Sequence, residues 1–263
     1  MRNAGMKVVI LAGGKGTRIS EESQLKPKPM IEIGGMPIIW HIMKIYSYYG
    51  FNEFIICGGY KQHMIKQWFS NYYIWNSDVT FEFGNKNNMI VHRDYTEDWR
   101  VTIVDTGLET LTGTRIAKVR PYIGEETFMM TYGDGVSDVN IKELVKYHNS
   151  NQAFVTLTAT RIQQRFGVLS IDGNSMVTSF REKSESDAER INAGYMVLDP
   201  QVFDYIGNKE VFFEQEPLKK LALDGKLAAY KHNGFWHPMD TMRDKETLEK
   251  LWKSGQAPWK IWE

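Results

Sequence analysis

The sequence has little of what several protein classes require. It has 263 residues and a single cysteine, Cys57, so an intramolecular disulfide framework is excluded. We find no apolar run long enough to span a bilayer and no charged-then-apolar targeting segment. Lys plus Arg and Asp plus Glu both number 32, so no net basic charge favours nucleic acid or an anionic membrane. We expect a globular cytoplasmic protein with neither nucleic acid nor membrane as a partner.

Strand and helix signals alternate through about the first 160 residues. The apolar run Lys7–Leu11 is typical of a buried strand, and Pro37–Tyr49 has helical apolar spacing with proline in its first turn. Such alternation predicts a mainly parallel sheet, with ligands at the carboxyl ends of its strands. The other elements expected here are strands Phe54–Cys57, Thr80–Phe83, Met89–His92, Val101–Val104, Thr127–Thr131 and Phe154–Ala159, and helices His63–Phe69, Thr112–Val119 and Ile141–Asn149.

Shorter strand signals follow Thr160. The turn residues Asp172-Gly173-Asn174 predict a hairpin between Gly167–Ile171 and Met176–Arg181. This predicts a small antiparallel layer beside the main sheet. The remaining expected elements are strands Gly194–Leu198 and Leu227–Lys231 and helices Val211–Leu223 and Met242–Lys253. Together the signals predict an α/β fold, with a Rossmann-like, mainly parallel or mixed central sheet and helices on both faces.

A glycine-rich loop, Leu11–Arg18 (LAGGKGTR), follows the first strand. It is not a Walker A motif, because Gly16 precedes Thr17-Arg18, and Ile19 replaces the third glycine of a dinucleotide fingerprint. The glycines alone fit a plain turn as well as a ligand loop. Arg18 and the proline-bracketed Lys28 favour a phosphate site, since glycine-rich backbone, guanidinium and ammonium all bind phosphate oxygens. Lys26 reads as an ordinary surface lysine.

Two acids are candidate metal ligands. Asp134 lies between glycines at the end of the strand Thr127–Thr131, where it could hold Mg²⁺ together with phosphate oxygens and water. Asp240 is the second candidate, although an aspartate before a helix is more typical of an N-cap. Asp105 and Asp138 read as caps or turn formers.

Residues for a sugar phosphate occur later in the chain. Gly167 gives backbone room in a strand, the pair Glu182-Lys183 offers an acid for hydroxyls and a base for phosphate, and Asn192 offers an amide. The pair fits a solvated surface ion pair equally well. His41 reads as a packing or surface histidine, and His237 has no evident partners for a zinc site.

These motifs together resemble the sugar-1-phosphate nucleotidyltransferase family. The resemblance runs from about Met6 to Glu263 and rests on LAGGKGTR, PKP (27–29), YGDG (132–135) and MDT (239–241). It implies that Arg18, Lys28 and Asp134 are catalytic and that Asp134 and Asp240 hold Mg²⁺. The nucleotide site implied by the resemblance comprises Leu11, Ala12, Gly13, Gly14, Lys15, Gly16, Thr17, Arg18, Lys28, Thr110, Arg115 and Gly133.

Within the family, the blocks FWHPMDTMRDK and APWKIWE are most similar to members that use CTP and glucose 1-phosphate. This implies a single domain over residues 6–263, with a nucleotide-binding part (6–160), a sugar-binding and C-terminal part (161–263) and an extension (1–5). The small antiparallel layer would serve sugar binding and oligomerisation. The resemblance also implies a homo-oligomer, for example a hexamer, and a role in bacterial surface polysaccharide (O-antigen) synthesis.

The sequence departs from the family pattern on the sugar side. Glu182-Lys183-Ser184 replaces E-K-P, and Asn192-Ala193-Gly194 replaces N-G-G. Three alternatives stay open at this point. The chain could use another nucleoside triphosphate or sugar, it could be a non-catalytic nucleotide-sugar sensor, or it could be an NAD-dependent oxidoreductase. Ile19 and the absence of an acid for the ribose disfavour the last.

Overall fold

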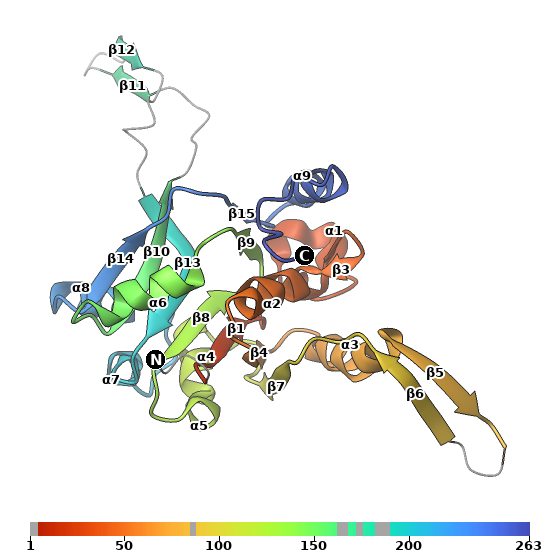
Figure 1. Cartoon of the computed structure of the whole chain (residues 1–263). Coiled ribbons are helices and arrows are strands. Elements are labelled where there is room, and N and C mark those ends of the chain that lie inside the picture. Colours follow the sequence, from red (N-terminus) through yellow and green to blue (C-terminus); the bar gives the residue numbers. More distant parts are fainter. Residues whose placement is uncertain (1–4, 85–87, 162–167, 172–175, 182–189) are drawn as a thin grey trace.

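In the described part of the chain, residues 5–84, 88–161, 168–171, 176–181 and 190–263 of a computed structural model, seven strands form a mixed central sheet (Figure 1). β13 runs antiparallel to both of its neighbours, whereas all other neighbours in the sheet are parallel. The expected mixed, mainly parallel sheet is confirmed. In spatial order the strands are β14 (Leu227–Lys231), β10 (Val155–Arg161), β13 (Arg190–Leu198), β8 (Phe128–Tyr132), β1 (Val8–Leu11), β4 (Glu53–Gly58) and β7 (Arg100–Asp105).

Helices cover both faces of this sheet because successive strand residues point to opposite sides. In β1, Val8 and Ile10 belong to one buried cluster, and Val9 and Leu11 belong to another. The first cluster contains side chains of α2 (Ile38–Tyr48), α3 (Gln62–Trp75), α6 (Ile141–Asn149) and α9 (Met242–Lys253). The second contains those of α4 (Thr112–Lys118), α5 (Arg120–Ile123), α7 (Val202–Ile206) and α8 (Glu216–Leu223).

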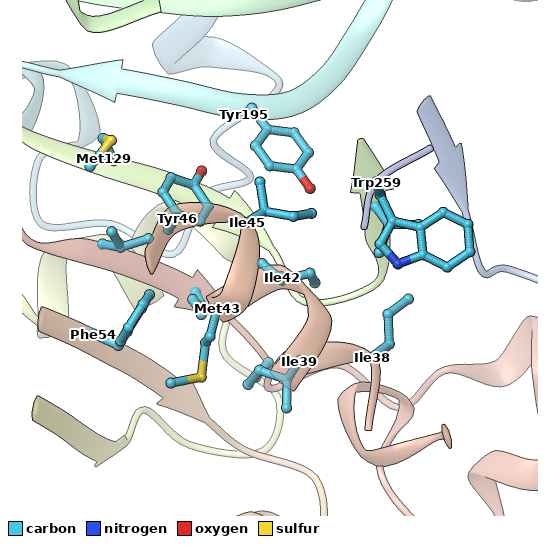
Figure 2. Close-up of a cluster of buried hydrophobic side chains, with 14 of the residues drawn as sticks. Ile38, Ile39, Ile42, Met43, Ile45, Tyr46, Phe54, Met129, Tyr195 and Trp259 are labelled. Carbon is cyan, nitrogen blue, oxygen red and sulfur yellow. The ribbon is translucent and has the colours of Figure 1, made fainter. Parts of the chain in front are cut away.

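The first cluster has α2 at its centre. Figure 2 shows Ile42 and Tyr46 of this helix between the strand residues and Trp259 near the C-terminus. Ile38, Ile42, Ile45 and Tyr46 are all fully buried, which matches the helical spacing of apolar residues. The helix thereby fixes the segment before it, which carries Lys28.

His41 of α2 lies in this apolar surrounding. It is fully buried, its Nε2 is 2.8 Å from the carbonyl oxygen of Ile33, and its ring packs edge-on against Trp40 and Trp252. Burial lowers its pKa to about 4, so the imidazole is neutral at pH 7. The predicted packing role is confirmed.

Besides the main sheet, the described residues contain four two-stranded sheets. The hairpin of β5 (Ser77–Glu82) and β6 (Asn88–Asp94) projects away from the body (Figure 1). The predicted hairpin forms from β11 (Val168–Ile171) and β12 (Val177–Arg181), while its turn, 172–175, lies outside the described residues. The other two sheets pair β2 (Glu32–Ile33) with β3 (Met36–Pro37) and β9 (Gly135–Ser137) with β15 (Trp236–Pro238). The remaining short elements are α1 (Ser20–Ser23) and the 3₁₀ turns η1 (Thr17–Ile19) and η2 (Lys28–Met30).

The second half of the chain differs from the prediction at several elements. α7 and β15 were not predicted, and two predicted elements have other bounds. β13 has nine residues and lies near the middle of the main sheet, although only Gly194–Leu198 was expected as a strand. The helix expected over Val211–Leu223 begins at Glu216, with Pro217 in its first turn. Residues 210–214 instead contact α4. Across the described residues, no helix is long and apolar enough to cross a membrane.

Candidate active site

The glycine loop leaves the carboxyl end of β1 and lines a cavity of about 330 Å³. The glycines of this loop are needed for different physical reasons. A Cβ on Gly13 would overlap the guanidinium of Arg115, and Gly16 has a positive φ of 65°. Gly14 faces open space, with no atom within 4 Å of the position of its missing Cβ. Gly14 is thus the loop position that leaves most room for a ligand.

Lys28 lies at the floor of this cavity and links the two predicted metal ligands. Its Nζ is 2.6 Å from Asp134 Oδ2 and 2.5 Å from Asp240 Oδ1. Arg18 adds a second cation, with one guanidinium nitrogen 2.7 Å from Asp240 Oδ2. Lys28 is only 8% exposed, whereas the side chain of Arg18 is 72% exposed. The contacts therefore run in series from exposed Arg18 through Asp240 and buried Lys28 to Asp134, although Asp240 itself is not in the cavity lining.

A short ribbon brings the two carboxylates together. Asp134 lies between the end of β8 and the start of β9. Asp240 lies two residues after β15, which pairs with β9. The Met239 amide donates to the Asp134 carbonyl at 2.7 Å and fixes the register. The N-cap of α9 is Thr241, in a capping box with Asp244, so the N-cap interpretation of Asp240 is wrong. The side chain of Asp240 is left to face the two cations.

Arg115 lies beneath the glycine loop as a buried cation. It donates to the carbonyl oxygens of Gly13, Gly58, Gly107 and Leu108 and to the hydroxyl of Thr106, at 2.6–3.2 Å. Burial lowers its pKa. Because these acceptors come from three segments, Arg115 holds the ends of β1, β4 and β7 together beneath the cavity.

Most of the predicted nucleotide residues line the same cavity. Lys15 does not, and its Nζ instead lies 2.6 Å from an oxygen of exposed Glu109. Thr110 lines the cavity, and its hydroxyl accepts a hydrogen bond from Lys118. The predicted residues in the lining are Leu11, Ala12, Gly13, Gly14, Gly16, Thr17, Arg18, Lys28, Thr110, Arg115, Gly133 and Asp134.

The predicted sugar side is described only at Asn192. This residue lies on β13, and its side-chain oxygen accepts from the Gly194 amide at 2.8 Å. Gly194 has a φ of 83° and packs against the Tyr132 ring, so glycine is required there. Gly167, Glu182 and Lys183 lie outside the described residues. Asn192 is not in the cavity lining, whereas Tyr132 is.

The other predicted acids and histidines have structural partners. Asp105 accepts from the Gly107 amide at 2.9 Å, which confirms a turn former. Asp138 pairs with His232 at 3.0 Å, and His237 Nδ1 lies 2.7 Å from the carbonyl oxygen of Pro238. Among the described residues, no group of three or more His, Cys, Asp or Glu side chains could hold a metal. A zinc-type cluster is therefore absent from that part of the chain.

Five residues of the cavity lining were not predicted as site residues: Pro29, Leu111, Thr112, Tyr132 and Phe212. Tyr132 donates a hydrogen bond to Glu214, and burial raises its pKa. Phe212 was placed within a predicted helix. Pro217 could have indicated the true start of this helix, because proline is typical of the first turn. Phe212 would then have been predicted in the preceding loop.

Comparisons with known proteins identify the family of the chain. The model of the nucleotidyl transferase family matches residues 7–244. A glucose-1-phosphate cytidylyltransferase from Salmonella typhi is 53% identical over 98% of this chain and 100% of its own length. A probable glucose-1-phosphate cytidylyltransferase from Bacillus subtilis is 45% identical over 98% of this chain and 100% of its own.

Solved structures share the fold. HddC from Yersinia pseudotuberculosis has a TM-score of 0.68 at 22% identity, over 94% of this chain and 100% of that one. A UDP-glucose pyrophosphorylase complexed with UDP-glucose also has a TM-score of 0.68, at 17% identity, over 95% of this chain and 99% of that one. With the glycine loop, Lys28 and the paired aspartates in place, the chain belongs to the nucleotidyl transferase family and groups there with the glucose-1-phosphate cytidylyltransferases.

Proposed function

We propose that the protein transfers a cytidylyl group from CTP to α-D-glucose 1-phosphate, giving CDP-glucose and pyrophosphate. The observation that carries this proposal is the contact of Lys28 with both Asp134 and Asp240 beside the glycine loop. The choice of CTP and glucose 1-phosphate rests on the relatives, two of which carry that activity in their names at 53% and 45% identity.

The reaction is an in-line displacement at the α-phosphorus. A phosphate oxygen of the sugar phosphate forms the new P–O bond, and the bond to the departing pyrophosphate breaks. No general base is needed, because a phosphate monoester with a second pKa of about 6 is mostly ionised at neutral pH. The obstacle is the approach of one anion to another, so positioning and charge dominate the catalysis.

Lys28 and Arg18 reduce this electrostatic repulsion, Lys28 from the floor of the cavity and Arg18 from its mouth. The ammonium of Lys28 is held at the floor by η2, whose flanking prolines restrict the backbone. It can therefore contact the reacting phosphate with little loss of freedom. Arg18 lies at the exposed mouth of the cavity, where its planar guanidinium can form bidentate hydrogen bonds with phosphate oxygens. Both cations would leave their aspartate partners for the incoming phosphates.

The two aspartates fit a magnesium ion. They are hard oxygen donors from separate elements that converge on one cation, the Lys28 ammonium. Mg²⁺ is usually held by one or two carboxylates together with substrate phosphates and water, which matches a pair rather than a larger cluster. When bound, the ion would orient the phosphates and offset their charge. Asp134 and Asp240 are the residues that would hold it.

Other parts of the proposal rest on the sequence resemblance. We propose a cytoplasmic homo-oligomer that serves nucleotide-sugar synthesis for surface polysaccharide. A sister specificity for another nucleoside triphosphate or sugar is the nearest alternative, and a non-catalytic nucleotide-sugar sensor is the more distant one. The presence of Lys28 with both aspartates supports catalysis, since binding alone does not require them.

Pyrophosphate release tests the proposal against both alternatives. The purified protein is incubated with CTP, UTP, dTTP or GTP and with glucose, mannose or galactose 1-phosphate, with and without Mg²⁺. The expected result is release with CTP and glucose 1-phosphate that depends on Mg²⁺. Release with a different pair would support a sister specificity, and no release with any pair would support the sensor.

A further inference from the structure

An aromatic side chain without a role in the mechanism above, Phe212, faces the cavity. It is 42% exposed and lines the cavity together with Leu111, Thr112 and the glycine loop. An exposed phenylalanine beside a polar phosphate site is unfavourable in water unless it contacts something apolar. The nearby ring of Tyr132 is more buried, and its hydroxyl is bound by Glu214. Phe212 therefore presents the accessible aromatic surface among the described lining residues.

The backbone around Phe212 is fixed on both sides by α4. The Val211 amide donates to Thr114 Oγ1 at 3.1 Å, and the Phe213 amide donates to Thr112 Oγ1 at 2.9 Å. The Gly113 amide donates to the Val211 carbonyl at 3.0 Å, and a Cβ on Gly113 would lie 2.9 Å from that oxygen. The segment therefore packs so closely against α4 that no side chain fits at position 113.

Two carboxylates complete this attachment. Glu210 accepts from the Leu111 amide at 3.0 Å, and Glu214 accepts from Thr112 Oγ1 at 2.6 Å. Phe213 is fully buried on the other side of the segment. Hydrogen bonds and burial thus hold the residues on both sides of Phe212 in place, and the ring of Phe212 itself faces the cavity. Because the backbone is already fixed, less conformational entropy is lost when a ligand binds against the ring.

The position of the ring within the cavity selects the part of the substrate that it meets. Arg18, Lys28 and Asp134 mark the phosphate end of the cavity. Phe212 shares the lining with Leu111 and Thr112 at the start of α4, whereas the sugar-side residue Asn192 is not in the lining. The nucleoside end of the triphosphate is therefore the ring-bearing group that reaches it.

We propose that Phe212 packs against the nucleoside of the triphosphate substrate and supplies much of the affinity for it. This inference rests on the proposed function only in that the cavity binds a nucleoside triphosphate. Base–aromatic stacking is weakened by about 1–3 kcal/mol when the aromatic ring is replaced by alanine. That loss corresponds to an increase in Kd of about 5- to 150-fold.

Titration calorimetry of the full-length protein without turnover tests this. The ligands are CTP, CMP, pyrophosphate and glucose 1-phosphate, and the variants are Phe212→Ala, Phe212→Leu and Phe212→Tyr. Tyr122→Ala is the matched control, because Tyr122 is similarly exposed, at 49%, and does not line the cavity. We expect Phe212→Ala to raise the Kd of CTP and CMP at least fivefold. Phe212→Tyr should stay near wild type, and Phe212→Leu should lie between.

The other ligands distinguish a nucleoside contact from a general effect. Pyrophosphate affinity should change by less than about twofold in every variant, because it depends on the phosphate end. Unchanged CTP and CMP affinity in Phe212→Ala would overturn the inference, as would a loss confined to glucose 1-phosphate. If Phe212→Ala does not fold, Phe212→Leu decides by the same criterion. A wild type that binds CTP through Phe212 but makes no CDP-glucose would contradict the proposed function alone.

Discussion

The ammonium of Lys28 lies 2.6 Å from Asp134 Oδ2, within a site where the same nitrogen also contacts Asp240. This places a cation of the protein itself at the point where both carboxylates converge. A metal ion held by the two aspartates and a lysine between them would occupy the same space. If Mg²⁺ binds both aspartates as proposed, Lys28 must move away from them when the metal and substrate enter.

Replacement of Lys28 should abolish most of the transfer activity. Lys28→Met keeps the length of the side chain but removes the cation that offsets phosphate charge. We expect kcat to fall by about 10²–10³, the effect of removing one preorganised donor from a developing charge. Lys26→Met is the matched control, since Lys26 lies two residues away and pairs with Glu32 at 2.8 Å outside the cavity. Near-normal turnover of Lys28→Met would contradict the assigned role.

The same contact predicts an effect on metal binding without substrate. In the absence of nucleotide, Lys28 competes with a metal ion for Asp134 and Asp240, so wild type should bind Mn²⁺ weakly. Lys28→Met leaves Asp134 without its cation partner and Asp240 paired only with Arg18, so it should bind Mn²⁺ at least several-fold more tightly, as measured by calorimetry. Adding Asp134→Asn to Lys28→Met should remove the gain. Equal Mn²⁺ affinity in wild type and Lys28→Met would show that the two cations do not share a position.

The glycine loop predicts opposite effects at neighbouring positions. Gly13→Ala places a methyl group against the buried guanidinium of Arg115 and should lower the free energy of unfolding by about 1–3 kcal/mol. Gly14→Ala points into open space and should change it by less than about 0.5 kcal/mol. Gly14→Ala should instead raise the KM for CTP, because the methyl group enters the space left for phosphates. Denaturant unfolding and steady-state kinetics of both variants are the measurements, and a reversed order would refute this division of roles.

Stability should fall in mild acid because of His41. Its folded pKa of about 4 lies below the value of 6.5 in the unfolded chain, so the unfolded state binds the proton first. The free energy of unfolding is therefore unaffected by this protonation above about pH 6.5. It falls as the pH drops toward 4, by about 3 kcal/mol at most. His41→Gln should be less stable at pH 7 yet lose less stability between pH 6.5 and 4. Parallel pH profiles of the two proteins would contradict this account.

Local pattern was sufficient to locate many of the elements and both halves of the phosphate site. The β1 run, the α2 periodicity and the helices Ile141–Asn149 and Met242–Lys253 have strong, local signals, and all are present in the structure. Asp134 and Asp240 could be selected as acids near strand ends. Their convergence could not be predicted, because it depends on the pairing of β9 and β15, strands of three residues each that have no readable periodicity.

The missed features depend on contacts between distant segments. Arg115 was predicted through the family resemblance as a nucleotide residue, but its burial was not, because that burial follows from carbonyls supplied by three separate segments. Phe212 has helical neighbours in sequence, but the hydroxyls of Thr112 and Thr114 hold its segment as a loop. Neither set of acceptors can be recognised until the segments have been brought together.

The most direct test of the central claim is a competition among substrates in one reaction. The protein is given equimolar CTP, UTP, dTTP and GTP with glucose 1-phosphate and Mg²⁺, and the nucleotide sugars formed are identified by mass spectrometry. The account predicts CDP-glucose as the main product, with none formed by Asp134→Asn. A main product with another base, or CDP-glucose formed equally well by Asp134→Asn, would contradict it.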